Sequence, residues 1–130
     1  MRVAVIDGQG GKMGQMIIER IKAAGLACEL IAIGTNSIAT SAMLKAGAAA
    51  GATGENPVIV AGRDADVIIG PIGIIAADSL LGEVTPAMAV AVGQSSAKKL
   101  LLPVNLCNNI IVGTGSVSMA KLVAETIDYL

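Results

Sequence analysis

Histidine, phenylalanine and tryptophan are absent from this chain of 130 residues, and tyrosine occurs once. Without histidine, the chain cannot build a histidine-ligated zinc site, a Ser-His-Asp triad or a histidine general base. With so few aromatic rings, it lacks the stacking platforms that hold single-stranded nucleic acid. The net charge of −1 supplies no basic stripe for a phosphate backbone. We therefore expect no nucleic-acid partner.

Charged side chains are also scarce. They make up 15% of the residues, against a usual share of about 25%, while 54% of the residues are hydrophobic. So few charges leave part of the surface apolar, and exposed apolar patches usually mark interfaces. We therefore expect a homo-oligomer. The length corresponds to one domain, residues 1–130.

No stretch of the sequence has the length of a membrane span. The longest apolar run, residues 67–77, is shorter than the roughly 20 residues that a helix needs to cross a bilayer. Asp7 interrupts the apolar start of the chain too early for a signal-peptide core. Cys28 and Cys107 lie far apart, without the C-x-x-C spacing of a metal site. These features predict a cytoplasmic protein with no membrane partner and no metal site.

Short aliphatic runs alternate with longer segments of helical periodicity, which is typical of βαβ units around a parallel sheet. The expected strands are residues 2–6, 29–33, 48–51, 66–70, 98–104 and 109–112. Helices are expected over residues 12–24 and 37–45, within 74–97, and over 116–129, the last with Ser116 as its cap. The pattern predicts a Rossmann-like, doubly wound α/β fold, with a mostly parallel sheet of about five or six strands and helices on both faces.

Residues 57–61 allow two interpretations. Val58, Ile59 and Val60 are β-branched and favour a strand. Asn56 followed by Pro57 is instead typical of a helix start, with the asparagine as cap and the proline at the first helical position. We favour the helix, because a strand at 66–70 needs an element before it.

The strongest functional signal follows the first strand, where the chain reads Gly8, Gln9, Gly10, Gly11, Lys12, Met13 and Gly14. The glycines follow the spacing G-x-x-G-x-x-G rather than the dinucleotide fingerprint G-x-G-x-x-G. Such a loop before a helix turns tightly and aims free N–H groups at an anion, and Lys12 adds a cation. It predicts a phosphate-bearing ligand, above all a nucleotide. The alternative is that the glycines only pack the helix against the sheet.

Asp7 and the ends of later strands extend this predicted site. Asp7 either contacts a Mg²⁺-phosphate, transfers a proton, or caps the turn. Thr35 and Asn36 stand where NAD-binding folds carry an acidic residue for the ribose diol, or they cap the next helix. Pro71-Ile72-Gly73 is either a ligand-contacting loop or an ordinary turn. Pro71, Ile72 and Gly73, together with Asn105 at the end of a later strand, could line the same crevice as the glycine loop.

Groups that could perform chemistry are few, and no catalytic residue is assigned. Cys107 is a candidate nucleophile, but the lysines nearest to it in sequence lie at the far end of the preceding strand, so a buried inert thiol is favoured. Glu83 is a candidate acid, with a solvated loop carboxylate as the favoured interpretation.

Two resemblances add to these interpretations. The stretch from Gly8 to Gly14 resembles the nucleotide loop of dihydrodipicolinate reductases, which implies that Gly8, Gly11, Lys12, Met13 and Gly14 lie against the pyrophosphate of NAD(P)H. The resemblance covers about the first 25 residues. Those reductases also need a second domain and catalytic histidines, which this chain lacks.

Over its whole length the sequence resembles a family of small bacterial proteins of unknown function. Its recognisable stretches here are residues 5–11, 69–73 and 82–86. Taken together, the sequence predicts a non-catalytic or sensing protein that binds a nucleotide or dinucleotide, possible cofactors being NAD(P). The alternatives are an NAD(P)H-dependent oxidoreductase completed across subunits, and a structural oligomeric subunit without a ligand.

Overall fold

Five parallel strands form one sheet in the computed structural model, which describes residues 1–104 and 108–130. Their order across the sheet is β3-β2-β1-β4-β5. The strands are β1 (Arg2–Asp7), β2 (Glu29–Gly34), β3 (Ala50–Thr53), β4 (Val67–Pro71) and β5 (Lys98–Leu102). This is the strand order of a doubly wound Rossmann sheet through its fifth strand. The predicted Rossmann-like α/β fold is therefore confirmed.

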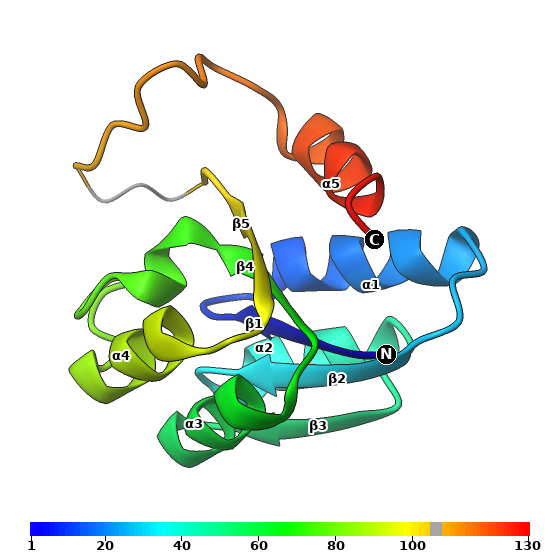
Figure 1. Cartoon of the computed structure of the whole chain (residues 1–130), viewed down its shortest axis with the longest axis horizontal. Helices are drawn as coiled ribbons and strands as arrows, with labels where there is room; N and C mark the ends of the chain where they lie inside the picture. The colour runs from blue at the N-terminus through cyan, green and yellow to red at the C-terminus, as the bar shows by residue number, and fades with distance from the viewer. Residues whose placement is uncertain (105–107) are drawn as a thin grey trace.

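Helices cover both faces of the sheet (Figure 1). They are α1 (Lys12–Ala23), α2 (Ser37–Lys45), α3 (Glu55–Asp64), the 3₁₀ turn η1 (Ile72–Ile75), α4 (Pro86–Gln94) and α5 (Met119–Ile127). Helices α1, α2 and α5 pack on one face, and α3 and α4 on the other. Successive strand residues point to opposite faces, so Val3 and Val5 join the first core and Ala4 and Ile6 join the second.

The helix starts follow local side-chain chemistry. In α2, Oδ1 of Asn36 accepts a hydrogen bond from the N–H of Ala39 at 2.8 Å. In α4, Oγ1 of Thr85 accepts from Met88 at 3.2 Å, ahead of Pro86 at the first helical position. Both caps satisfy N–H groups that a helix leaves unpaired in its first turn.

The structure decides the open segment and corrects two predictions. Residues 57–61 lie in α3 and are helical, but the residue before the helix is Gly54, and Asn56 lies inside it. The last helix is capped by Ser118, whose Oγ accepts from Lys121, and Ser116 lies outside it. In both cases the residue before the helix lies two positions away from the predicted cap, at Gly54 instead of Asn56 and at Ser118 instead of Ser116.

The sixth predicted strand is wrong. Residues 109–112 form coil and a turn beyond β5, in the long connection that arcs away from the sheet (Figure 1). Ile110 and Val112 are 84% and 92% exposed, so their β-branched side chains meet no apolar face. β-propensity expresses a fit to a half-buried pleated surface, and without such a surface it does not form a strand.

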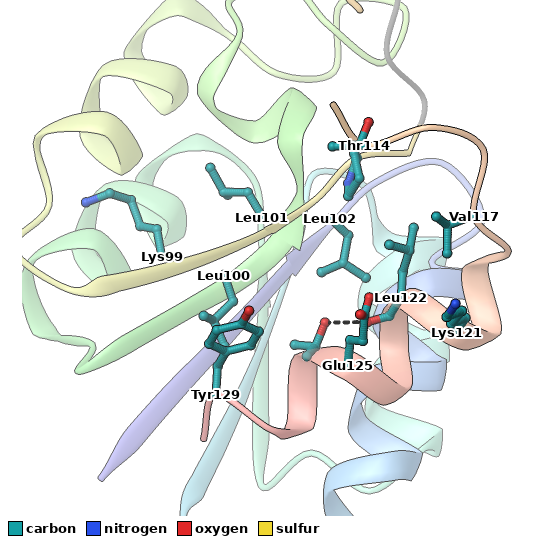
Figure 2. Close-up of a pocket in the computed structure, with 12 residues that line it drawn as sticks. Lys99, Leu100, Leu101, Leu102, Thr114, Val117, Lys121, Leu122, Glu125 and Tyr129 are labelled. Atoms are coloured by element: carbon teal, nitrogen blue, oxygen red, sulfur yellow. Dashed lines mark hydrogen bonds between the residues drawn. The ribbon is translucent and has the colours of Figure 1, made fainter. Parts of the chain in front are cut away.

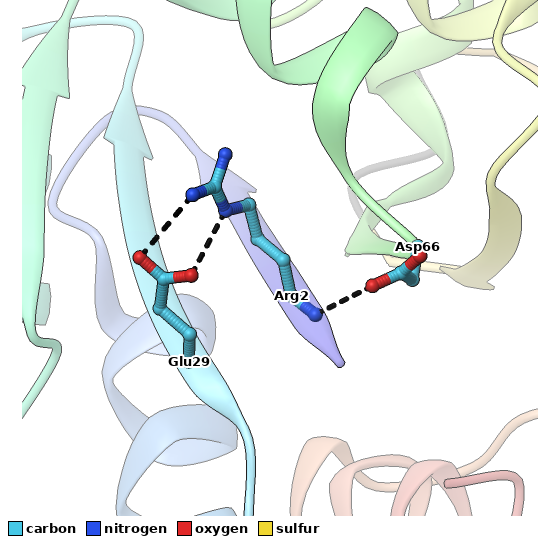
Figure 3. A network of polar contacts seen from close by, with 3 residues as sticks. All are labelled: Arg2, Glu29 and Asp66. Atoms are coloured by element: carbon cyan, nitrogen blue, oxygen red, sulfur yellow. Dashed lines mark hydrogen bonds and ion pairs between the residues drawn. The ribbon is translucent and has the colours of Figure 1, made fainter.

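A polar cluster marks the amino-terminal edge of the sheet (Figure 3). This amino-edge cluster consists of Arg2, Glu29 and Asp66. Nε of Arg2 lies 3.0 Å from Oε2 of Glu29, and the backbone N–H of Arg2 donates to Oδ2 of Asp66 at 2.7 Å. The cluster joins the starts of β1 and β2 to the residue before β4, at the opposite end of the sheet from the glycine loop. None of the helices that the structure describes is long and apolar enough to cross a membrane.

Candidate functional site

The glycine loop, residues 8–14, leaves β1 at the carboxyl edge of the sheet and becomes α1. The N–H of Gly11 donates to the carbonyl of Gly8 at 2.9 Å and closes the turn. Gln9 and Gly11 have φ values of 50° and 72°, in the left-handed region. A left-handed backbone conformation costs little free energy at a glycine and more at Gln9. The contacts around Gln9 must therefore hold the turn in this conformation.

Protein contacts account for three of the four glycines. A Cβ at Gly8 would lie 2.5 Å from Oγ1 of Thr35, and one at Gly11 would lie 2.7 Å from Cα of Ala39. A Cβ at Gly14 would collide with the sulfur of Met43. Gly10 differs, because nothing lies within 4 Å of its Cβ position. The packing alternative thus explains Gly8, Gly11 and Gly14, and it leaves Gly10 unexplained.

Asp7 lies beneath the loop and has the geometry of a cap. Its side chain is buried, with Oδ1 accepting from the N–H of Gly8 and Oδ2 from the N–H of Gly14, both at 2.8 Å. Burial raises the pKa of Asp7, the two N–H donors partly oppose this, and the charge of Glu83 adds to the rise. Both oxygens are engaged within the protein, as the cap interpretation requires.

Glu83 reaches the top of the same loop from the connection between β4 and α4. Its Oε1 accepts from the N–H of Gln9 at 2.9 Å, from Oγ1 of Thr35 at 2.7 Å and from Nδ2 of Asn36 at 2.6 Å. Burial raises the pKa of Glu83, but these three hydrogen bonds outweigh it and the net pKa is lowered. We call Gln9, Thr35, Asn36 and Glu83 the carboxyl-edge cluster.

This cluster is one-sided. All three hydrogen bonds end on Oε1, and within the described ranges Oε2 of Glu83 accepts none. Glu83 also has no cationic partner, since no lysine or arginine among the described residues forms an ion pair with it. Asn36 also donates to the carbonyl of Gln9 at 2.9 Å, so it ties the cluster to the loop while its Oδ1 caps α2. The result is a carboxylate that is fixed through one oxygen, while the other has no partner among residues 1–104 and 108–130.

Residues 76–84, which we call the covering segment, pack against the residues that follow β1 and β4. Leu80 is 2% exposed, and its two Cδ atoms lie 2.9 Å and 3.9 Å from the positions that a Cβ would take at Gly8 and Gly73. Ser79 donates to the carbonyl of Gly73, and the N–H of Asp78 donates to the carbonyl of Val84 at 2.7 Å. The leucine therefore fills the point where the strand order reverses, which is where ligands enter open α/β sheets.

The backbone of the covering segment is strained. Asp78, Leu80 and Leu81 have φ values of 64°, 55° and 57°, which non-glycine residues rarely adopt. Leu81 is 96% exposed and makes no compensating apolar contact with the core. Strained residues of this kind persist where packing over-determines them, often at functional sites.

The other predicted site residues fall into three groups. Thr35 and Asn36 belong to the carboxyl-edge cluster, and the side chain of Lys12 is exposed at the first position of α1. Pro71 and Gly73 are buried and Ile72 is half-buried, at the end of β4. Met13 is buried in the core. Asn105 and Cys107 lie outside the described residues.

Sequence reasoning underestimated Glu83. Neither of the two interpretations given to it, a general acid or a solvated loop carboxylate, includes three donors at one oxygen. Gln9 and Glu83 lie 74 positions apart, so no local pattern joins them. A signal was present all the same, because Glu83 falls within the stretch 82–86 that carries the whole-chain resemblance.

A concave surface lies between β5 and α5, away from the glycine loop (Figure 2). Leu100 and Leu102 point toward α5, whereas Lys99 and Leu101 point away from it. The groove has a volume of about 520 Å³. Its other described side chains include Lys121 and Glu125 of opposite charge, so it has no dominant sign of charge. Nothing in the described part of the chain gathers three or more acidic or cysteine side chains as a metal site requires.

Comparison with known proteins identifies the family. A family model described as "Domain of unknown function (DUF3842)" matches residues 2–130. The chain belongs to this family. The whole-chain resemblance to proteins of unknown function is thereby confirmed, and the family description names no reaction.

No curated protein matches the chain. Among solved structures, the chain is similar to a dodecameric FMN-dependent Ubix-like decarboxylase from Escherichia coli O157:H7. The identity is 14% and the TM-score 0.48, over 99% of this chain and 93% of that chain. At this distance, the ligand and the assembly of that enzyme do not transfer to this chain.

Proposed function

We propose that this protein binds a phosphate-bearing nucleotide at the glycine loop and acts as a binding or sensing module. The observation that carries the proposal is the carboxyl-edge cluster, in which an acceptor, Glu83, is fixed beside the loop and its Oε2 accepts no hydrogen bond from the described residues. A nucleotide has a phosphate and sugar hydroxyls, and it therefore needs donors and an acceptor side by side.

The donor half of this site is the start of α1. Asp7 takes the N–H groups of Gly8 and Gly14, and Glu83 takes that of Gln9. Within the described residues, the N–H groups of Gly10, Lys12 and Met13 donate to no protein acceptor. These groups and the exposed ammonium of Lys12 suit a phosphate, since a helix amino terminus favours an anion.

The non-catalytic part of the proposal follows from the groups beside the loop. The pKa of Asp7 is raised, but its side chain is buried and both oxygens accept backbone hydrogen bonds, so it does not offer a proton to a ligand at the loop. The lowered pKa of Glu83 keeps that carboxylate ionised, so it does not act as an acid near neutral pH. The structural-subunit alternative draws support from the packing at Gly8, Gly11 and Gly14. A substitution at Gly10 can distinguish ligand binding from a purely structural role, because packing does not explain this glycine.

The decisive test replaces Gly10 by valine. Gly10 has no left-handed φ and faces open space, so the variant should keep the thermal stability of the wild type while its side chain obstructs the loop. Gly93, another glycine with open space around it, provides the matched control Gly93→Val. The measurement is the melting temperature with and without inorganic phosphate, AMP, ADP, FMN, NAD⁺ and NADP⁺.

At a ligand concentration of 100 Kd, binding stabilises the native state by about 2.7 kcal/mol. We expect at least one nucleotide to raise the melting temperature of the wild type and of Gly93→Val, but not of Gly10→Val. If no compound stabilises the wild type, or if Gly10→Val responds as strongly, the loop is architecture and the structural-subunit function stands.

We further propose that the protein assembles as a homo-oligomer. Leu81, Ile110 and Val112 are each more than four-fifths exposed, which is costly for a monomer with so few charges. Native mass spectrometry should find a closed oligomer in the wild type, and a shift toward monomer when Ile110 and Val112 are both replaced by aspartate. A monomeric wild type would contradict this.

A further inference from the structure

We propose that the ligand is a nucleoside phosphate with one nucleotide unit and a free 2′,3′-cis-diol, and that Glu83 holds this diol. The inference rests on the proposed nucleotide-binding function and specifies it further. It states which sugar the site accepts and how many nucleotide units fit, and it assigns Glu83 as the residue that determines both the sugar and the charge at its 2′ position.

The first argument is the position of the carboxylate. In dinucleotide-binding sheets of this strand order, an acidic residue at the end of the second strand binds the ribose hydroxyls. Here β2 ends at Gly34, followed by the neutral residues Thr35, Asn36 and Ser37. Glu83 supplies the missing carboxylate from another segment, because Thr35 and Asn36 both donate to its Oε1.

The second argument is the state of that carboxylate. Its three donors fix Oε1 and leave Oε2 as an acceptor without a described partner. The lowered pKa keeps Glu83 ionised at neutral pH. An ionised carboxylate attracts hydroxyl donors and repels a phosphate, since like charges at short range are strongly unfavourable. A 2′-phosphorylated sugar therefore does not suit this position.

The third argument concerns the space on the other side of the loop. The second half of a dinucleotide crosses the switch point between β1 and β4. In this protein Leu80 fills that point, between Gly8 and Gly73, and Ser79 is bonded to Gly73 beneath it. The covering segment is tied by its own hydrogen bonds, such as that from Gly82 to Asp78 at 3.1 Å. The residues present therefore fit one nucleotide unit and do not fit NAD(P).

Isothermal titration calorimetry on the full chain tests these points with probes that differ in one feature each. The probes are AMP and GMP, their 2′-deoxy forms, adenosine 2′,5′-bisphosphate and NAD⁺. A hydrogen bond to a charged group corresponds to about a 10- to 100-fold change in affinity, so we expect the deoxy forms to bind at least about 10-fold more weakly. The bisphosphate should bind more weakly than the deoxy form, and NAD⁺ no more tightly than AMP.

The variant Glu83→Gln keeps the shape of the side chain and removes its charge. We expect it to bind AMP or GMP about 10-fold more weakly and to lose most of the discrimination against the 2′-phosphate. The matched control is Glu19→Gln, which removes an exposed glutamate that is bonded to Gln15 on the same α1 helix. Its affinities should equal those of the wild type, and melting temperatures show that both variants are folded.

Each contrary outcome has a distinct meaning. If Glu83→Gln binds AMP or GMP more tightly than the wild type, the Glu83 carboxylate competes with the ligand for the site. This result would overturn its role in binding the diol. Equal binding of the ribo and deoxy forms, or NAD⁺ binding more than 10-fold tighter than AMP, would overturn the inference while leaving nucleotide binding intact. If the wild type binds none of these probes, the proposed function fails together with the inference.

Discussion

The two ends of β1 carry polar clusters of opposite character. At the amino-terminal edge, Arg2 forms an ion pair with Glu29, and both side chains are about half exposed. At the carboxyl edge, the partners of Glu83 in the described part of the chain are neutral donors, and the charges of Asp7 and Glu83 lie close enough to interact.

The proposed function rests on this difference. An ion pair that neutralises itself at an exposed edge needs no further partner and contributes little to stability. A carboxylate to which the described residues supply no cation leaves negative charge at the edge where α/β sheets bind ligands. We therefore propose the carboxyl-edge cluster as part of the binding site and regard the amino-edge cluster as a surface contact.

The largest expected effect comes from removing the support of the carboxyl-edge cluster. Leu80→Ala deletes a buried side chain and should lower the free energy of unfolding by about 2–5 kcal/mol, because the transfer and cavity costs add. Leu81→Ala is the matched control, since Leu81 has nearly the same φ and is 96% exposed. Urea denaturation measures both. Equal effects would mean that the covering segment does not support the site.

A smaller effect is expected when a donor of the cluster becomes an acceptor. Asn36→Asp keeps an oxygen for the cap of α2 but places a second carboxylate at the 2.6 Å contact with Glu83. We expect a loss of about 1–3 kcal/mol at pH 7, which diminishes in acid as protonation restores a donor. Asn56→Asp, at an exposed position inside α3, is the control. A loss that does not change with pH would contradict the direct contact with Glu83.

How much of this the sequence could predict depends on the range of the interactions. The strands and helices follow periodicity, which is local, and the fold was predicted with one strand too many. Residues 109–112 have the composition of a strand but form coil and a turn outside the sheet, because strand pairing does not depend on local composition alone. Single residues decide where a helix begins, and several candidates lie close together. The predicted caps are Asn56 and Ser116, whereas the structure has Gly54 and Ser118 before the helices.

The site shows the same division. The glycine loop, Thr35 and Asn36 each follow a strand, so the rule for parallel sheets brought them together in advance. Glu83 and Leu80 come from a connection whose path is set by strained backbone at Asp78, Leu80 and Leu81. No periodicity encodes that path, so the position of Glu83 and Leu80 beside the glycine loop is visible only in the three-dimensional structure.

The charge of Glu83 should also be visible in the pH dependence of stability. Its folded-state pKa is lowered below the ordinary value of 4.5, so its contribution is present above that value and is lost as the pH falls through the folded pKa. At pH 7, Glu83→Gln should be less stable than the wild type by about 1 kcal/mol. The difference should shrink below pH 4.5. Asp7, whose pKa is raised, titrates in both proteins and largely cancels in the difference. A difference that grows in acid would contradict the assigned direction.

The smallest effect is expected at the opposite edge of the sheet. Arg2→Met keeps the apolar stem of the side chain and removes the ion pair with Glu29, while the backbone N–H of residue 2 still donates to Asp66. Because both partners are exposed and screened by salt, the melting temperature at physiological ionic strength should stay within the error of the measurement, as should nucleotide affinity. A clear loss of stability in this variant, comparable to that of Asn36→Asp, would mean that uncompensated charge does not distinguish the two edges. The carboxyl-edge cluster would then be one more structural contact, and the charge of Glu83 would no longer indicate a function.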